Sequence, residues 1–259
     1  MKKQSLCCRL NGKRELGGGV VRLDFEWPGP PPRAGQFFMV KPARSSVFLA
    51  RPLSVAACGV NAAAFLAAVR GKGTAELAAM TPGEQALLTG PFGKDWAGFM
   101  PQNAAKPALL LSGGLGIAPL AAFSVELRRA SVNFDFLAGF KRSADGINII
   151  SALGIGRDEV EIAGEDISGQ SNVRYGLVTD FLDAQNYSAV FACGPAVMMR
   201  NAALLCRKAG TPCFVSLETR MACGTGACLG CAVPVKGGGY RRCCADGPVF
   251  DAGEVFFDE

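Results

Sequence analysis

The chain has 259 residues, a net charge of +5 and no histidine, and 49% of its residues are hydrophobic. This composition predicts well-packed globular domains, and the length exceeds that of one typical domain. The basic residues are scattered, so the charge indicates a solvated surface and no nucleic-acid binding. The absence of histidine excludes Ser-His-Asp catalysis, Cys-His catalysis and every histidine metal site.

The first nine residues lack the apolar run of a signal peptide. The most hydrophobic segment, residues 108–123, is interrupted by glycines and Pro119 and is shorter than the ~18 residues of a membrane span. We therefore expect a cytoplasmic protein that does not associate with membranes. In that reducing compartment the eleven cysteines are expected to be ligands or buried small side chains rather than disulfides.

The first hundred residues contain short apolar runs separated by glycine and proline. They predict strands at residues 19–26, 36–41, 47–57, 63–70 and 85–89. Repeated short strands with turn signals are typical of a small antiparallel barrel. The composition changes near residues 103–107, where we expect this domain to end.

Two segments of the predicted barrel have residues suited to a flavin dinucleotide. The first is Arg51-Pro52-Leu53-Ser54, in which the arginine suits a pyrophosphate and the serine hydroxyl can reach the flavin ring edge. The second is a glycine turn with Gly73 and Thr74, where we predict a helix that has Thr74 as its N-cap. Helix N-termini bind phosphate. An arginine next to a strand is more often only a solvated side chain, so the interpretation depends on both segments together.

The second part of the chain alternates strands and helices, which predicts a parallel sheet. Strands are expected at residues 108–112, 133–139, 159–163 and 189–193, and helices at 120–130, 177–183 and 196–208. Residues 145–156 are expected to be irregular. From residue 214 onward the chain is rich in cysteine and glycine, which indicates a third module.

Two turns of this part follow apolar strands and precede helices. One contains Gly113, Gly114 and Gly116, and the other is Cys193-Gly194-Pro195. Small residues allow a dinucleotide to approach a helix N-terminus closely, although the first turn is not the GxGxxG fingerprint. Each is also compatible with a plain tight turn. Cys193 is a candidate catalytic residue beside a nicotinamide, whereas the alternative is an inert buried thiol.

Cys223, Cys228 and Cys231 have the CxxxxCxxC spacing of a plant-type [2Fe–2S] cluster, and three glycines are interleaved with them. Such a cluster moves single electrons. A four-cysteine zinc site is the alternative. The fourth ligand is Cys243 or Cys244, and spacing does not choose between adjacent residues.

These segments, in this order, resemble one family, the electron-transfer subunit of class 1B dihydroorotate dehydrogenase, a branch of the ferredoxin-reductase superfamily. The resemblance is strongest from Leu217 to Phe250. It implies an α+β multidomain fold with an FAD-binding antiparallel barrel (1–102), an NAD-binding α/β domain with a parallel sheet (103–212) and a [2Fe–2S] domain (213–259). It also implies Cys244 as the last cluster ligand, because the family has that cysteine two places before Asp-Gly-Pro-Val-Phe.

The resemblance implies a further flavin segment, Leu66-Ala67-Ala68, where family members often carry a larger or polar residue at the two alanines. It implies a partner subunit that contains FMN and oxidises dihydroorotate in pyrimidine biosynthesis, in a heterotetramer with two of each chain. Electrons would pass through the [2Fe–2S] cluster to FAD and then to NAD+. The dihydroorotate site would lie on the partner.

Two alternatives stay open from the sequence. One is the flavin subunit of an NADP-linked ferredoxin reductase or sulfide dehydrogenase, in which the first cluster cysteine tends to be aspartate, unlike Cys223. The other is a zinc-stabilised interaction protein with no redox role.

Overall fold

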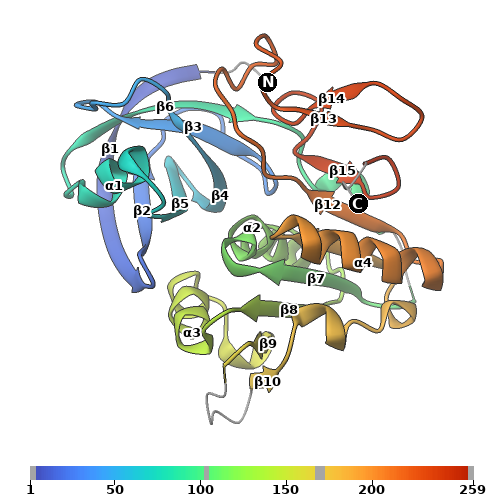
Figure 1. Ribbon diagram of the computed structural model, residues 1–259. Helices are drawn as coiled ribbons and strands as arrows, with labels where there is room; N and C mark the ends of the chain where they lie inside the picture. Colours follow the sequence, from blue (N-terminus) through green and yellow to red (C-terminus); the bar gives the residue numbers. More distant parts are fainter. Residues whose placement is uncertain (1–3, 102–104, 167–172, 256–259) are drawn as a thin grey trace.

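The computed structural model describes residues 4–101, 105–166 and 173–255. Figure 1 shows a strand-rich barrel formed by the N-terminal part, an α/β layer formed by the middle of the chain and a C-terminal segment that runs back beside the barrel. The predicted boundary between residues 102 and 103 lies outside the described residues. Among the described helices none is long and apolar enough to cross a membrane.

The N-terminal part is a closed antiparallel barrel, as predicted, with strand order β1-β2-β5-β4-β3-β6. The short helix α1 (Lys72–Ala79) connects β5 to β6. The strands are β1 (Gln4–Gly17), β2 (Val20–Glu26), β3 (Phe37–Pro42), β4 (Arg51–Gly59), β5 (Ala62–Ala68) and β6 (Gln85–Phe92).

The long strand β1 was not predicted. Its side chains are mostly polar or charged, and only Cys8, Leu10 and Leu16 are buried along it. The strand owes its conformation to pairing on both sides, with β2 and with β6, which is a tertiary effect.

Aromatic rings fill the centre of the barrel. Phe38 is fully buried and makes edge contacts with Trp27 and Phe65, at centroid distances of 4.7 and 5.5 Å. Such pairs add about 0.5–1.5 kcal/mol each to the free energy gained by burial. The barrel is therefore held by its own hydrophobic core.

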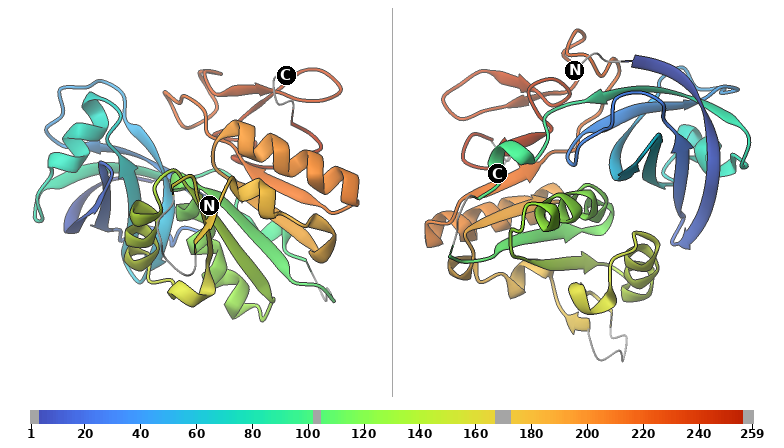
Figure 2. Two further views of the ribbon diagram at one scale, coloured as in Figure 1. Left: turned by 60° about the horizontal axis from the view of Figure 1, so that its bottom comes forward. Right: turned by 180° about the vertical axis from the view of Figure 1, so that it is seen from behind.

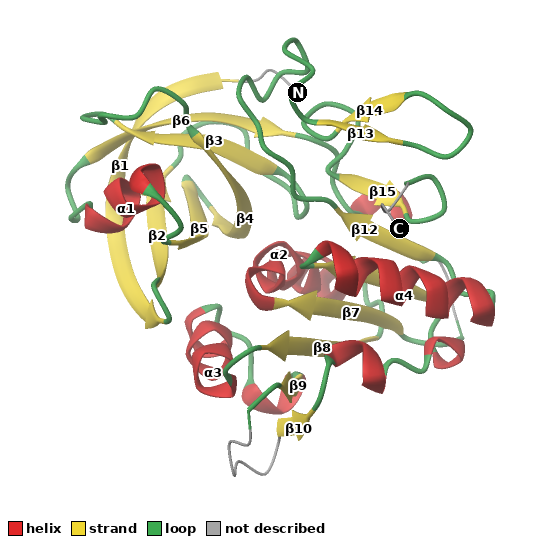
Figure 3. Ribbon diagram, in the orientation of Figure 1, coloured by secondary structure: helices red, strands yellow, loops and turns green. Residues whose placement is uncertain are grey.

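The middle of the chain forms a seven-stranded sheet with order β10-β9-β8-β7-β11-β12-β15, in which all neighbours are parallel except the antiparallel pair β12 and β15. Figures 2 and 3 show helices on both faces of this sheet. The strands are β7 (Ala108–Gly113), β8 (Phe134–Phe140), β9 (Glu161–Gly164), β10 (Val173–Tyr175), β11 (Ala189–Cys193), β12 (Cys213–Ser216) and β15 (Val249–Asp251). The helices are α2 (Ile117–Arg129), α3 (Ser143–Ala152) and α4 (Ala196–Ala209).

Two predictions about this part were wrong. Residues expected to be irregular contain α3, whose first backbone N–H, on Ser143, donates to the distant Asp166 carboxylate at 2.9 Å. Gly146 of α3 packs so closely on the Phe140 ring that a Cβ there would overlap the ring. The helix expected at residues 177–183 is only a short 3₁₀ turn, Val178–Phe181.

The C-terminal segment is built onto the edge of the sheet. Its strands β12 and β15 pair with each other, and β12 also pairs with β11. A separate hairpin is formed by β13 (Ala232–Pro234) and β14 (Tyr240–Arg242). The third module predicted from residue 213 thus shares strands with the parallel sheet, and the exact three-part division stays a prediction.

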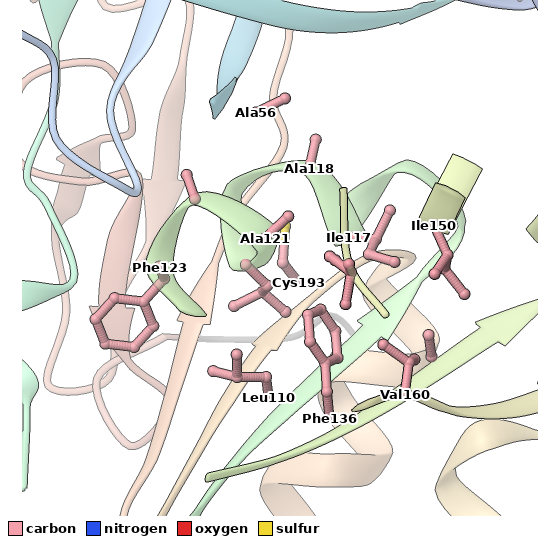
Figure 4. Close-up of a cluster of buried hydrophobic side chains, with 14 of the residues drawn as sticks. Ala56, Leu110, Ile117, Ala118, Ala121, Phe123, Phe136, Ile150, Val160 and Cys193 are labelled. Carbon is pink, nitrogen blue, oxygen red and sulfur yellow. The ribbon is translucent and has the colours of Figure 1, made fainter. Parts of the chain in front are cut away.

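Helix α2 joins the barrel to the sheet through one continuous core. Figure 4 shows α2 between Ala56 of β4 and Leu110 of β7. Nearby, the fully buried Trp96 stacks on Phe123 of α2 and meets the Phe191 ring of β11 edge-on, with centroid distances of 5.8 and 5.7 Å. This shared core fixes the barrel relative to the sheet, so the space between them has a defined shape.

Candidate functional site

A cavity of about 270 Å³ lies where the barrel, the sheet and the C-terminal segment meet, and we call it the interdomain cavity. Sequence segments that are far apart converge on it. It is lined by Phe37, Pro52, Leu53, Ser54, Leu66, Ala67, Ala68, Arg70, Thr74, Leu115, Ala118, Cys193, Ser216, Leu217, Glu218, Thr219, Met221 and Pro248. Eight of the candidate residues named from the sequence are on this lining, and none of the candidate metal ligands is among them: Pro52, Leu53, Ser54, Leu66, Ala67, Ala68, Thr74 and Cys193.

The Arg51 side chain lies against the start of α1. A Cβ at Gly73 would overlap Arg51 Nε, so only glycine leaves room for the guanidinium there. Arg51 Nη2 donates to the Leu49 carbonyl at 3.2 Å, whereas Arg51 Nε is buried and has no hydrogen-bond partner among the described residues. A buried donor of this kind requires an acceptor, and a pyrophosphate oxygen would supply one.

Thr74 does not cap α1 in the way the sequence predicted. The helix begins at Lys72 with Gly71 as N-cap, and Thr74 is the third helical residue. Its Oγ1 accepts hydrogen bonds from the backbone N–H groups of Arg70 and Gly71, at 2.9 and 3.2 Å. Thr74 therefore fixes the turn before the helix, beside the interdomain cavity that it also lines.

The segment Leu66-Ala67-Ala68 forms the end of β5 and one wall of the interdomain cavity. Leu66 and Ala67 are buried, and Ala68 is partly buried. The alanine methyl groups carry no hydrogen-bonding atoms, so this wall offers polar contacts through its backbone only.

The two glycine turns pack against each other at the carboxyl ends of β7 and β11. A Cβ at Gly116 would overlap the Cys193 carbonyl, and a Cβ at Gly113 would lie 2.7 Å from Pro195 Cδ. A Cβ at Gly194 would lie 2.8 Å from the backbone nitrogen of Gly113. Gly114 differs, because it has φ +54° and open space around it. Close packing thus explains three of these glycines, and Gly114 is the position that a dinucleotide could approach.

Cys193 is buried at the end of β11, and its side chain points toward α2 in Figure 4. In the sheet it pairs with Ser112 of β7 and Ser216 of β12. Burial, followed by the nearby Glu218 carboxyl, raises the Cys193 pKa far above that of an ordinary thiol. The group is therefore a neutral thiol facing the interdomain cavity and not a nucleophilic thiolate.

The cysteines of the predicted cluster form two pairs. Cys231 and Cys244 are buried, with their sulfur atoms 3.2 Å apart, and the Cys244 N–H donates to Cys231 Sγ at 3.4 Å. Cys223 and Cys228 form the second, more exposed pair, and each sulfur accepts a backbone N–H from the residue two places further on. A [2Fe–2S] cluster bound by four cysteines has two on each iron, so this arrangement fits it.

Cys223 has the electronic character of a ligand. Its pKa is lowered to about 5, first by a hydrogen bond with the Thr225 side chain and then by one with the Cys228 backbone. A thiolate is the form that binds metal. No three of the described histidine, cysteine, aspartate or glutamate side chains converge on a single point as for one metal ion.

Cys243 and its neighbour Cys244 point in different directions. The Cys243 thiol donates to the Leu217 carbonyl at 3.2 Å, and burial raises its pKa to about 12. Cys244, in contrast, faces Cys231. The geometry supports Cys244 as the fourth ligand, in agreement with the resemblance.

Residues 217–221 connect the interdomain cavity to the cluster loop. Leu217, Glu218, Thr219 and Met221 line the cavity, and the first cluster cysteine follows two residues later. The sequence analysis had not assigned these residues, or Ser216, to the flavin site. Their position directly before the first cysteine was the available signal, but only the packing of β12 beside β11 brings them to the cavity.

A closed antiparallel barrel packed on a parallel α/β sheet, with a cavity between them, defines the class of flavin-dependent ferredoxin reductases. A chain of an NADH-dependent reduced ferredoxin–NADP oxidoreductase superposes with a TM-score of 0.82 and 26% identity, covering 97% of this chain and 90% of that chain. A Neisseria gonorrhoeae ferredoxin NADP+ reductase with bound FAD and NADP shares the fold at a TM-score of 0.65 and 15% identity, covering 81% of this chain and 92% of that chain.

The particular family follows from the sequence comparisons. The iron–sulfur cluster binding domain of dihydroorotate dehydrogenase B matches residues 218–256. The dihydroorotate dehydrogenase B (NAD(+)) electron transfer subunit of Caldanaerobacter subterraneus subsp. tengcongensis is 37% identical over 96% of this chain and 97% of its own length. The Clostridium perfringens subunit is also 37% identical, over 94% of each chain. The chain belongs to the family of dihydroorotate dehydrogenase B electron transfer subunits.

Proposed function

We propose that this chain is the electron-transfer subunit of an NAD-dependent dihydroorotate dehydrogenase in pyrimidine biosynthesis. It would receive electrons from a catalytic subunit that contains FMN and pass them through a [2Fe–2S] cluster and FAD to NAD+. The observation that carries the proposal is the convergence of the segments 52–54 and 66–68, Cys193 and the segment before the cluster cysteines on one cavity. The same proposal includes a cytoplasmic location and a complex with two copies of each chain. It also includes the division of this chain into three domains, with boundaries after residues 102 and 212.

The residues of the chain have distinct parts in this proposal. FAD, when bound, would supply both the single-electron exchange with the cluster and the hydride exchange with NAD. Arg51 and the N-terminus of α1 would hold its pyrophosphate, with Pro52, Leu53, Ser54 and the β5 wall around its ring. Gly114 and the Cys193-Gly194-Pro195 turn would receive the dinucleotide NAD. Cys193 would contact the reacting rings as a neutral thiol.

Two cysteines on each side would hold the cluster, Cys223 with Cys228 and Cys231 with Cys244. The dihydroorotate site would lie on the partner, as the resemblance to the family implies.

The test is reconstitution with the partner. We expect purified protein to show flavin absorption and to contain about two irons per chain, as a [2Fe–2S] cluster requires. Co-expression with a candidate FMN subunit should then give dihydroorotate-dependent NAD+ reduction. A colourless protein that holds zinc would refute the proposal.

A second candidate is the flavin subunit of an NADP-linked ferredoxin reductase, favoured by the structural similarity to the NADH-dependent reduced ferredoxin–NADP oxidoreductase over 97% of this chain. Full FAD and cluster content without a complex or dihydroorotate activity, together with reduction of a ferredoxin, would support this candidate instead.

A further inference from the structure

Another cavity, of about 310 Å³, lies between the second half of α4 and the C-terminal segment, and we call it the basic cavity. Its volume is within the roughly 300–1,000 Å³ of small-molecule sites. Cys213, the first residue of β12, is part of its lining. The basic cavity therefore lies at the amino end of β12, whereas the two glycine turns follow the carboxyl ends of β7 and β11. It is separate from the interdomain cavity, with which it shares no residue.

Three cations line the basic cavity. Arg200 and Arg207 lie two turns apart on α4 and hence on the same face of this helix, and Lys236 comes from the turn between β13 and β14. None of the three forms an ion pair within the part of the chain that the structure describes. Asp251 supplies the one carboxylate of the described lining. This excess of positive charge favours an anionic ligand.

The positions of the cations argue against a role in helix stability alone. A cation in the last turn of a helix interacts favourably with the helix dipole, and Arg207 has such a position in α4. Arg200 lies further from that end of the helix, and Lys236 belongs to a different element. The backbone N–H of Lys236 donates to the Glu254 carbonyl at 2.8 Å, which holds its turn against the C-terminal segment. Two separate elements thus bring positive charge to one cavity.

Two thiols meet at the wall of the basic cavity. Cys213 lines the cavity, and Cys206 of α4 lies behind it with no exposed surface. The turn between them is closed by a hydrogen bond from the Thr211 N–H to the Cys206 carbonyl at 3.0 Å. The Cys213 thiol donates a hydrogen bond to Cys206, and this bond lowers the pKa of Cys206. Two free thiols in contact, one of them facing a cavity, are the arrangement that thiol–disulfide exchange requires.

We propose that the basic cavity binds anionic low-molecular-weight disulfides and that Cys213 and Cys206 reduce them by forming a disulfide bond with each other. In the first step Cys213 Sγ attacks one sulfur of the bound disulfide, which forms a mixed disulfide and releases one thiol. In the second step Cys206 Sγ attacks Cys213 Sγ and releases the second thiol. The bound disulfide gains two electrons and the two cysteines lose them, while the two cysteine protons leave on the released thiols.

The test uses the purified holoprotein and two disulfides of opposite charge. Glutathione disulfide is the anionic probe, and cystamine, which is cationic at neutral pH, is its matched control. Samples are quenched with acid, alkylated and mapped by mass spectrometry, so that each cysteine is followed separately. We expect glutathione disulfide to produce the Cys206–Cys213 disulfide. The exposed Cys7 reports the unselective reaction in the same samples.

Charge variants test the role of the cations. Arg207→Gln should lower the rate with glutathione disulfide roughly threefold, as expected for one exposed ion pair, and Arg200→Gln/Arg207→Gln should lower it about tenfold. Neither should lower the rate with cystamine. Lys208→Gln is the matched control, because it removes the same charge from the next residue of α4, which does not line the basic cavity. Both of its rates should stay near those of the wild type.

A cysteine variant tests the order of the two steps. Cys206→Ser should stop the reaction at the mixed disulfide on Cys213, because the second attacking sulfur is absent. The adduct adds the mass of one glutathione to the peptide that contains Cys213.

Three results would overturn the inference. The first is a Cys206–Cys213 pair that stays reduced while Cys7 reacts completely. The second is an equal effect of Arg207→Gln and Lys208→Gln on the rate with glutathione disulfide, which unspecific attraction to a basic surface would cause. The third is folded Cys206→Ser protein without an adduct on Cys213. If Cys206→Ser does not fold, the first two measurements decide, since neither needs a cysteine variant.

Discussion

The barrel and the cluster segment, residues 217–247, are stabilised in different ways. The barrel surrounds a core of buried rings, with Phe38 between Trp27 and Phe65. The described cluster segment has one short hairpin, and Cys228 and Leu229 in its loop are exposed. A region without its own hydrophobic core depends on local polar contacts and on metal ligation, so cofactor loss should affect the two regions unequally.

The largest expected effect is on the cluster. Cys244→Ser should abolish it, because the buried proposed ligand that faces Cys231 is lost, whereas Cys243→Ser should keep about two irons per chain. Iron content and the visible spectrum measure the result. Flavin content should survive in both variants, since the barrel does not depend on the cluster. A cluster retained in Cys244→Ser and lost in Cys243→Ser would reverse the ligand assignment.

The second largest expected effect is on the stability of the barrel. Phe38→Ala removes a fully buried ring and should lower the free energy of unfolding by about 3–5 kcal/mol. Urea unfolding measures this change. Phe48→Ala is the matched control, because the Phe48 side chain is 91% exposed, and its unfolding free energy should stay near that of the wild type. Equal destabilisation by both substitutions would contradict the assignment of the barrel core.

A smaller effect is expected where the barrel holds the proposed flavin pyrophosphate. Gly73→Ala places a methyl group on Arg51 Nε and should displace the guanidinium. A hydrogen bond to a charged group contributes about 1.5–3 kcal/mol, so the FAD dissociation constant should rise roughly 10- to 100-fold.

Fluorescence titration of the flavin-free protein with FAD measures this constant. Gly71→Ala is the control, because its Cβ would have no neighbour within 4 Å and its extended φ of −177° suits any residue. FAD binding to Gly73→Ala with wild-type affinity would exclude Arg51 from the pyrophosphate site.

The smallest effect concerns an ion pair in the cluster segment. Arg242 donates two hydrogen bonds to the Asp246 carboxylate, both at 3.0 Å, and holds the pKa of Asp246 at about 2. Because this pKa is lowered by folding, the stabilisation is fully present above the ordinary value of 3.8 and is lost as the pH falls toward 2. Thermal unfolding should show a slightly lower Tm for Asp246→Asn at pH 6, and the difference from the wild type should narrow below pH 4. A difference that widens with acid would contradict this sign.

Local patterns in the sequence predicted most of the architecture. The alternating strands and helices gave the parallel sheet, and the glycine and proline punctuation gave the barrel. The prediction failed for β1, whose polar side chains carry little strand signal, and for α3, whose capping carboxylate on Asp166 lies 23 residues away. Both elements depend on contacts between distant segments, which no local pattern contains.

The candidate site divides in the same way. The spacing of the cluster cysteines and the Arg51 and glycine motifs are local, because a ligand loop or a phosphate-binding turn is formed by consecutive residues. Thr74 was identified as a site residue but assigned the wrong position in the helix, and the packing role of Gly113, Gly116 and Gly194 was not foreseen. These errors arose because the neighbouring turn determines the space around Gly113, Gly116 and Gly194, and the Arg51 side chain determines the space at the start of α1.

The sequence by itself predicted the cluster loop and the segments of a flavin and a nucleotide site, since each of these is defined over a few adjacent residues. The tertiary structure decided which of the adjacent cysteines faces Cys231, and it brought Glu218 to the interdomain cavity. The first outcome follows from the β13–β14 hairpin, which brings residues 243 and 244 beside Cys231, and the second from the pairing of β12 with β11, which joins the cluster segment to the sheet.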